Sequence, residues 1–193
     1  MNIQSLNQIF QNSKLLEASV KSNYLAYNKF CEIKRTMYDM ADSFKLNIQV
    51  LATSYRYIDG AIAMYISSVQ YGDVIAVSVD KMDARKDSFE ISMHEIAHAK
   101  LNKIKNKDCI LKEFVELIED NPYLTYKLSG YLSSNLEEYK FTKQIKFAEE
   151  VFCELISSRK SPVRAQCSKI LFAGCIPDDV KDEIINISSK FNI

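Results

Sequence analysis

The chain has 193 residues, of which 47% are hydrophobic and 26% are charged, a composition typical of a folded globular protein. Its 25 basic and 25 acidic residues give a formal net charge of zero, which argues against a general nucleic-acid or membrane-surface binder. The first residues show no signal peptide, and no apolar run reaches the length of a membrane span. Five cysteines, without the spacing of a small disulfide scaffold, favour a cytoplasmic protein with reduced thiols.

The chain begins with two segments whose apolar residues recur at helical spacing. This periodicity predicts helices over residues 3–18 and 20–44. We expect them to form an N-terminal part, residues 1–45, that packs on the core and contributes no chemistry.

Residues 46–80 have a different pattern, rich in β-branched and aromatic residues, which predicts a small sheet. Asp59-Gly60 and Gly72-Asp73 are turn signals. Because the connections are short, we expect an antiparallel meander of three strands. The expected strands are residues 48–55, 61–68 and 74–79.

A helix is predicted over residues 87–105, after the N-cap signal of Asp87 with Glu90 three residues later. It carries His94-Glu95-Ile96-Ala97-His98, an H-E-x-x-H pattern. Histidines four residues apart share one helix face, so their rings can ligate one zinc ion. Glu95 follows the first ligand and suits a general base that acts on the water the metal activates.

The histidine count supports a metal site. The chain has two histidines, and both lie in this motif, so a pair that only satisfies core hydrogen bonds is the weaker interpretation. The third ligand cannot be a histidine, which leaves a carboxylate or a thiolate.

Helices are also predicted over residues 109–120, 135–159 and 163–173, and a last one opens at Pro177. They form a C-terminal part, residues 109–193, within one domain covering residues 1–193.

The second of these helices holds the candidate third ligand. Glu150 and Glu154 are four residues apart, so one can bind zinc while the other accepts a hydrogen bond from a ligand histidine. A solvated acidic stripe that includes Glu149 is the plain alternative. Cys109 is a weaker candidate for the third ligand.

From Asp39 to Ile156 the sequence resembles the ImmA/IrrE family of metallopeptidases, which are gluzincin-type zincins. The resemblance is carried by His94–His98 and by Glu150, Cys153, Ile156 and Ser157, which fit the family's later glutamate motif. It favours Glu150 over Glu149 as ligand and gives Glu154 the place of the acid four residues on. Glu150-Val-Phe-Cys-Glu154 also resembles the Glu-x-Phe-x-Glu of lethal-factor-like and Pro-Pro-specific endopeptidases.

The resemblance implies an α+β, zincin-like fold, with a small antiparallel sheet packed on the metal helix and helices on either side. It also implies a zinc-dependent endopeptidase that cleaves a protein or peptide substrate, such as a repressor or another regulatory protein. The expected metal ligands are His94, His98 and Glu150, with Glu95 as the base. The alternative is a zinc-bound regulatory or interaction protein with little hydrolytic activity.

Substrate binding is expected along a strand edge, because an extended peptide can add to a sheet through main-chain hydrogen bonds. We expect the strand Val74–Val79 to provide this edge, since it directly precedes the metal helix. Its apolar run also suits a central strand that is already paired on both sides.

Overall fold

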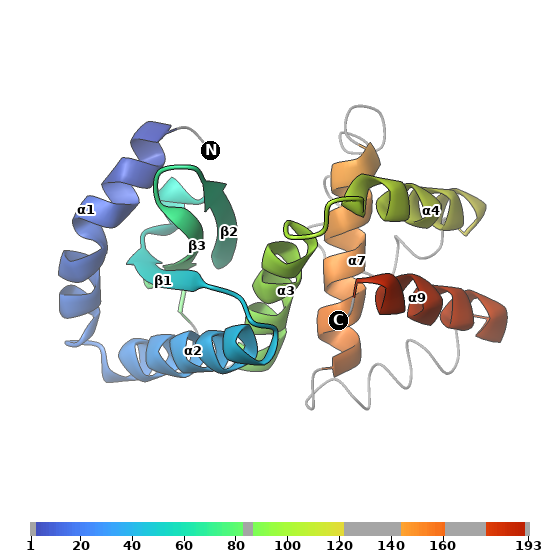
Figure 1. The fold of residues 1–193 in the computed structure, drawn as a ribbon. Coiled ribbons are helices and arrows are strands. Elements are labelled where there is room, and N and C mark those ends of the chain that lie inside the picture. The colour runs from blue at the N-terminus through green and yellow to red at the C-terminus, as the bar shows by residue number, and fades with distance from the viewer. Residues whose placement is uncertain (1–2, 83–86, 122–143, 161–176, 192–193) are drawn as a thin grey trace. The chain divides into compact units, whose positions relative to one another are not determined.

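The computed structural model describes residues 3–82, 87–121, 144–160 and 177–191 (Figure 1). Six helices and a three-stranded sheet make up this described part, so the α+β class is confirmed. The chain falls into two compact units, Met1–Ala99 (the first unit) and Lys100–Ile193 (the second unit). One domain over residues 1–193 stays a prediction.

Two helices open the first unit, as predicted: α1 (Ile3–Val20) and α2 (Tyr24–Ser43). Asn23 separates them because its side-chain oxygen accepts a hydrogen bond from the backbone N–H of Ala26, which caps α2. The structure therefore extends the first expected helix by two residues and starts the second four residues later.

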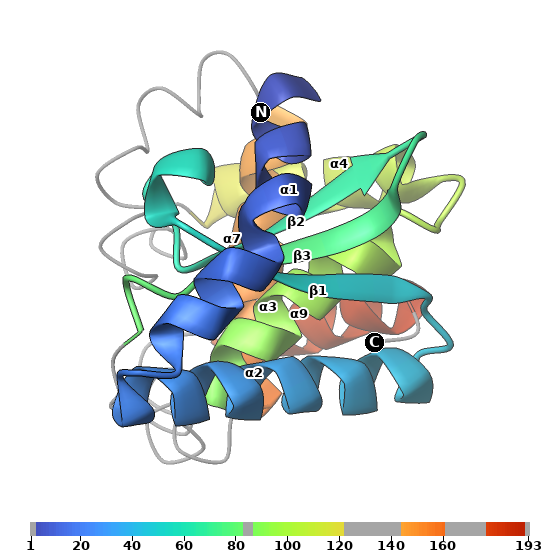
Figure 2. The same cartoon turned by 90° about the vertical axis from the view of Figure 1, so that its left-hand side faces the viewer.

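The sheet contains β1 (Ile48–Thr53), β2 (Ala63–Ser68) and β3 (Gly72–Ser78). Its order is β1-β3-β2, with β3 parallel to β1 and antiparallel to β2 (Figure 2). The predicted antiparallel meander is therefore wrong, because the sheet is mixed. The predicted substrate edge at residues 74–79 is also wrong, because β3 is the central strand.

The connection from β1 to β2 explains the first error. A short 3₁₀ helix, η1 (Tyr55–Tyr57), follows β1, and Asp59 and Gly60 then adopt positive φ angles of 51° and 80°. The Asp-Gly turn is present, yet it returns the chain to pair with β3 and not with β1. A local turn signal specifies a change of direction, not the partner of the next strand.

Burial explains the second error. Every residue of β3 after Gly72 is buried, whereas the edge strand β2 is buried only at Ala63. A strand that is apolar on both faces gains most when it is covered on both faces, which favours a central position.

Helices cover both faces of the sheet in the first unit (Figures 1 and 2). On one face, Ile75 and Val77 of β3 pack in a cluster with Ile33 and Met37 of α2. That cluster includes Ile96 and Ala99 of α3 (Ser88–Leu101), the helix with the H-E-x-x-H motif. On the other face, Ala76 packs with Ile9 of α1 and with Ile58.

In the second unit, the described residues form α4 (Lys107–Asp120), α7 (Gln144–Lys160) and α9 (Asp178–Lys190). Phe152 of α7 lies at their centre, with ring centroids 5.6 Å from Phe114 and 4.9 Å from Phe191. Helices were predicted in all three places. The helix expected over 163–173 and the start of the one expected over 135–159 lie outside the described residues.

Among the helices that the structure describes, none is both long enough and apolar enough to cross a bilayer. The cytoplasmic location stays a prediction.

Asp80, which follows β3, joins the ends of two strands by hydrogen bonds. Its carboxylate accepts bonds from the hydroxyls of Ser78 and Ser54, at 2.6 and 2.7 Å, and from the backbone N–H of Tyr55, at 2.9 Å. Burial alone would raise the pKa of Asp80 and is the largest single effect. These three hydrogen bonds and one from the backbone of Asp80 itself together outweigh burial, so the pKa of Asp80 lies below the usual value.

We predict that Asp80→Asn lowers the stability of the protein at pH 7. Because the folded pKa is depressed, the stabilisation is present above the unfolded pKa of about 3.9 and is lost as the pH falls through the folded pKa. The expected loss is about 0.5–1 kcal/mol, since Asp80 is solvent-exposed and water screens its charge. Urea unfolding followed by circular dichroism at pH 7 and pH 3 measures it, with Asp59→Asn as the control. An equal difference at both pH values would contradict the prediction.

Candidate metal centre

The helix α3 begins where the sequence predicts. Asp87 precedes it, and its side-chain oxygen accepts a hydrogen bond of 3.0 Å from the backbone N–H of Glu90. Asp87 therefore caps one of the amide groups that the first turn leaves without a helical partner. The N-cap prediction is confirmed, and the helix starts six residues before the first histidine.

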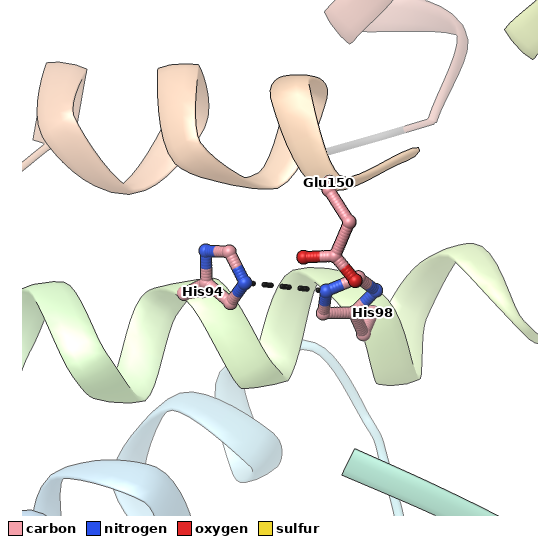
Figure 3. A group of neighbouring side chains, drawn as sticks. All are labelled: His94, His98 and Glu150. Atoms are coloured by element: carbon pink, nitrogen blue, oxygen red, sulfur yellow. Dashed lines mark hydrogen bonds between the residues drawn. The ribbon is translucent and has the colours of Figure 1, made fainter. Parts of the chain in front are cut away.

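His94 and His98 lie one turn apart on α3 with their rings edge to face. The ring centroids are 5.0 Å apart at an angle of 68°, and the two Nε2 atoms are 3.3 Å apart (Figure 3). Both residues are half-buried.

This spacing fits a shared zinc ion. A tetrahedral ion about 2.0–2.1 Å from each ligand separates any two ligand atoms by about 3.3–3.4 Å. The same 3.3 Å also suits a hydrogen bond in which one Nε2 donates to the other. Metal binding would require both Nε2 atoms to be deprotonated, with the protons carried on Nδ1.

Glu150, on α7, completes a group that could hold a metal ion. His94, His98 and Glu150 each offer one ligand atom, and these atoms all lie within 4.8 Å of one another (Figure 3). Two imidazoles and one carboxylate are a donor set that zinc accepts with a fourth position left for water or substrate. The residues present therefore fit the ion that the sequence implies.

The neighbouring acids differ from Glu150 in their surroundings. The Glu149 carboxylate forms an ion pair with Lys107 of α4, with an N–O distance of 3.3 Å. Glu154, half-buried one turn further along α7, is not part of the group that could hold a metal, and neither is the exposed Cys109. The role of Glu154 beside a ligand histidine stays a prediction.

Glu95 points to the sheet. It is 7% exposed, and its carboxylate accepts a hydrogen bond of 2.6 Å from the backbone N–H of Tyr65 in β2. The Tyr65 hydroxyl in turn donates to Asp73 of β3, at 2.7 Å. The proposed base is thus attached to the edge strand of the sheet through a main-chain donor.

Sequence reasoning missed this contact. A backbone N–H belongs to every residue except proline, so residue type at position 65 carries no signal for it. The pairing of β2 with β3, which leaves Tyr65 N–H on the outer side of the sheet, was the information needed.

No protein-family model, curated protein or solved structure matches the chain in the comparisons made. The candidate metal centre is therefore supported by the geometry of His94, His98 and Glu150 alone.

We predict that the purified protein holds about one zinc per chain and that His94→Ala or His98→Ala removes it. Loss of one protein ligand out of three weakens zinc binding greatly, because the remaining pair cannot complete the tetrahedron. Elemental analysis after dialysis measures the zinc content. Stoichiometric zinc in the double variant would contradict the assignment.

Glu150→Ala and Glu149→Ala form a matched pair that identifies the third ligand. We expect Glu150→Ala to lose zinc, whereas Glu149→Ala loses the ion pair with Lys107 and retains zinc. Zinc content is measured as for the histidine variants. Zinc retained in Glu150→Ala and lost in Glu149→Ala would identify Glu149 as the third ligand.

Proposed function

We propose that the chain is a zinc-dependent endopeptidase that cleaves a protein or peptide substrate. The observation that carries the proposal is the pair of Nε2 atoms 3.3 Å apart on α3, with Glu95 between the two histidines in sequence. A zinc site that serves structure alone needs no base, whereas a hydrolytic site requires one.

His94, His98 and Glu150 would hold the ion. Bound there, zinc would polarise a carbonyl and acidify a water molecule. The oxygen of the attacking water bonds to the carbonyl carbon, and Glu95 takes a proton from that water at the same time. The carbon–nitrogen bond then breaks, and Glu95 delivers the proton to the departing nitrogen, which gives a carboxylate and an amine.

The substrate is proposed to lie along β2. Within the described sheet, β2 pairs on one side only, with β3, so its other side can accept an extended peptide. Glu95 hydrogen-bonds to this same side, so the peptide and the base meet there.

The resemblance of residues 39–156 to the ImmA/IrrE metallopeptidases supports the proposal. It favours Glu150 as the third ligand and suggests a repressor or other regulatory protein as substrate. The balanced charge of the chain gives no reason to expect direct binding of nucleic acid.

Glu95→Gln tests the function. Glutamine is nearly isosteric but cannot accept the proton, so we expect cleavage to fall by about 10²–10⁴-fold while zinc content and fold are retained. Casein and a mixture of unstructured peptides serve as probes, with mass spectrometry to detect new termini. Glu90→Gln makes the same chemical change in the first turn of α3 and is the control.

Cleavage by Glu95→Gln at the rate of the unchanged protein would show that Glu95 is not the base. A zinc-replete wild-type protein that cleaves neither probe would favour the alternative, a zinc-bound interaction protein.

A further inference from the structure

The pairing of β2 with β3 determines which backbone groups of β2 face outward. The two strands are antiparallel, and Ser78 N–H donates to the Ile62 carbonyl at 2.8 Å, next to the pair Ala63–Val77. Because hydrogen-bonded and non-hydrogen-bonded pairs alternate along an antiparallel ladder, Met64, Ile66 and Ser68 bond to β3. The N–H and C=O groups of the alternate residues, Ala63, Tyr65 and Ser67, point away from β3.

Of the three outward N–H groups, the middle one, that of Tyr65, donates a hydrogen bond to Glu95. Its carboxylate accepts the Tyr65 N–H at 2.6 Å, a short hydrogen bond, and bonds to charged acceptors are shorter and stronger than neutral ones. Both residues belong to the first unit, and Glu95 is 7% exposed, so few water molecules compete for this bond.

We propose that the Tyr65 amide positions Glu95 and thereby marks the place of cleavage on the substrate. This inference rests on the proposed endopeptidase function. The amide does not touch the reacting atoms; it acts through the carboxylate, whose orientation it fixes.

The place of cleavage follows from the hydrogen bonds that remain. A peptide on the edge of β2 can form hydrogen bonds with the backbone of Ala63 and Ser67. Its carbonyl opposite Tyr65 cannot accept from the Tyr65 N–H, because that N–H already donates to Glu95. This peptide carbonyl therefore forms no hydrogen bond with β2 and lies beside Glu95. A reacting carbonyl must be free of strand pairing and within reach of the base, so it is the one opposite Tyr65.

Amide hydrogen exchange tests the contact without any need for activity. We expect the Tyr65 amide to exchange slowly and to speed up about tenfold or more in Glu95→Ala, because it loses a bond to a charged acceptor. The Ser67 amide, on the same edge, is the internal comparison and should not change. Equal exchange of the Tyr65 amide in wild type and Glu95→Ala would overturn the proposal.

Proline substitutions test the role in catalysis. Tyr65→Pro and Tyr65→Ala both lack the phenol, but only the alanine variant keeps the amide, and proline is tolerated at an outward-facing edge position. On a peptide that the wild-type protein cleaves, we expect kcat to be about 100-fold lower in Tyr65→Pro than in Tyr65→Ala, with similar KM. Ser67→Pro removes an outward donor that Glu95 does not use, so it should raise KM and leave kcat within a few-fold.

Zinc content and circular dichroism establish that each variant folds. If Tyr65→Pro does not fold, the exchange experiment still shows whether the Tyr65 amide donates to Glu95. Equal kcat in folded Tyr65→Pro and Tyr65→Ala would overturn the positioning role while the proposed function stands. If the wild-type protein, with zinc bound and a slow Tyr65 amide, cleaves no peptide, the endopeptidase function fails and the contact is structural only.

Discussion

The candidate site depends on how α3 is rotated about its axis against the sheet. Ile96 and Ala99 are fully buried in the cluster formed with α2 and β3, so the helix cannot turn without exposing them. Successive residues of an α-helix are about 100° apart around the axis. Burial of Ile96 and Ala99 therefore fixes the directions of His94, Glu95 and His98 at the same time.

The site also depends on the central position of β3 in the sheet. With β1 on one side and β2 on the other, the strand that sequence order places next to α3 is the one already paired on both sides. Glu95 instead contacts β2, which lies further back in the chain. The outer side of β2 and the carboxylate of Glu95 are thereby brought together by sheet order and not by closeness in sequence.

Features specified within a few residues could be predicted from the sequence. The cap at Asp87 and the first turn of α9 at Asp178 follow from side chains next to the backbone groups they serve. The histidine pair belongs to this class too, because a four-residue spacing on a helix fixes its own geometry. The cap at Asn23 was missed, so the predicted start of α2 was four residues too early.

Two features that depend on residues far apart in sequence could not be predicted. The parallel pairing of β1 with β3 and the bond from Tyr65 to Glu95 arise only once the sheet has formed. The preference for Glu150 over Glu149 came from the resemblance, and Glu150 is the one that the structure groups with the two histidines. The ion pair of Glu149 with Lys107 on α4 could not be read from the sequence.

The bond between Tyr65 and Glu95 has a consequence for the behaviour of the protein at high concentration. An edge strand with unoccupied main-chain donors is a template on which strands of other molecules can assemble. In β2 the buried carboxylate of Glu95 occupies the central donor of the six-residue strand, so a foreign strand cannot form an uninterrupted ladder there. The contact between Tyr65 and Glu95 thus opposes the addition of a further strand to this edge of the sheet.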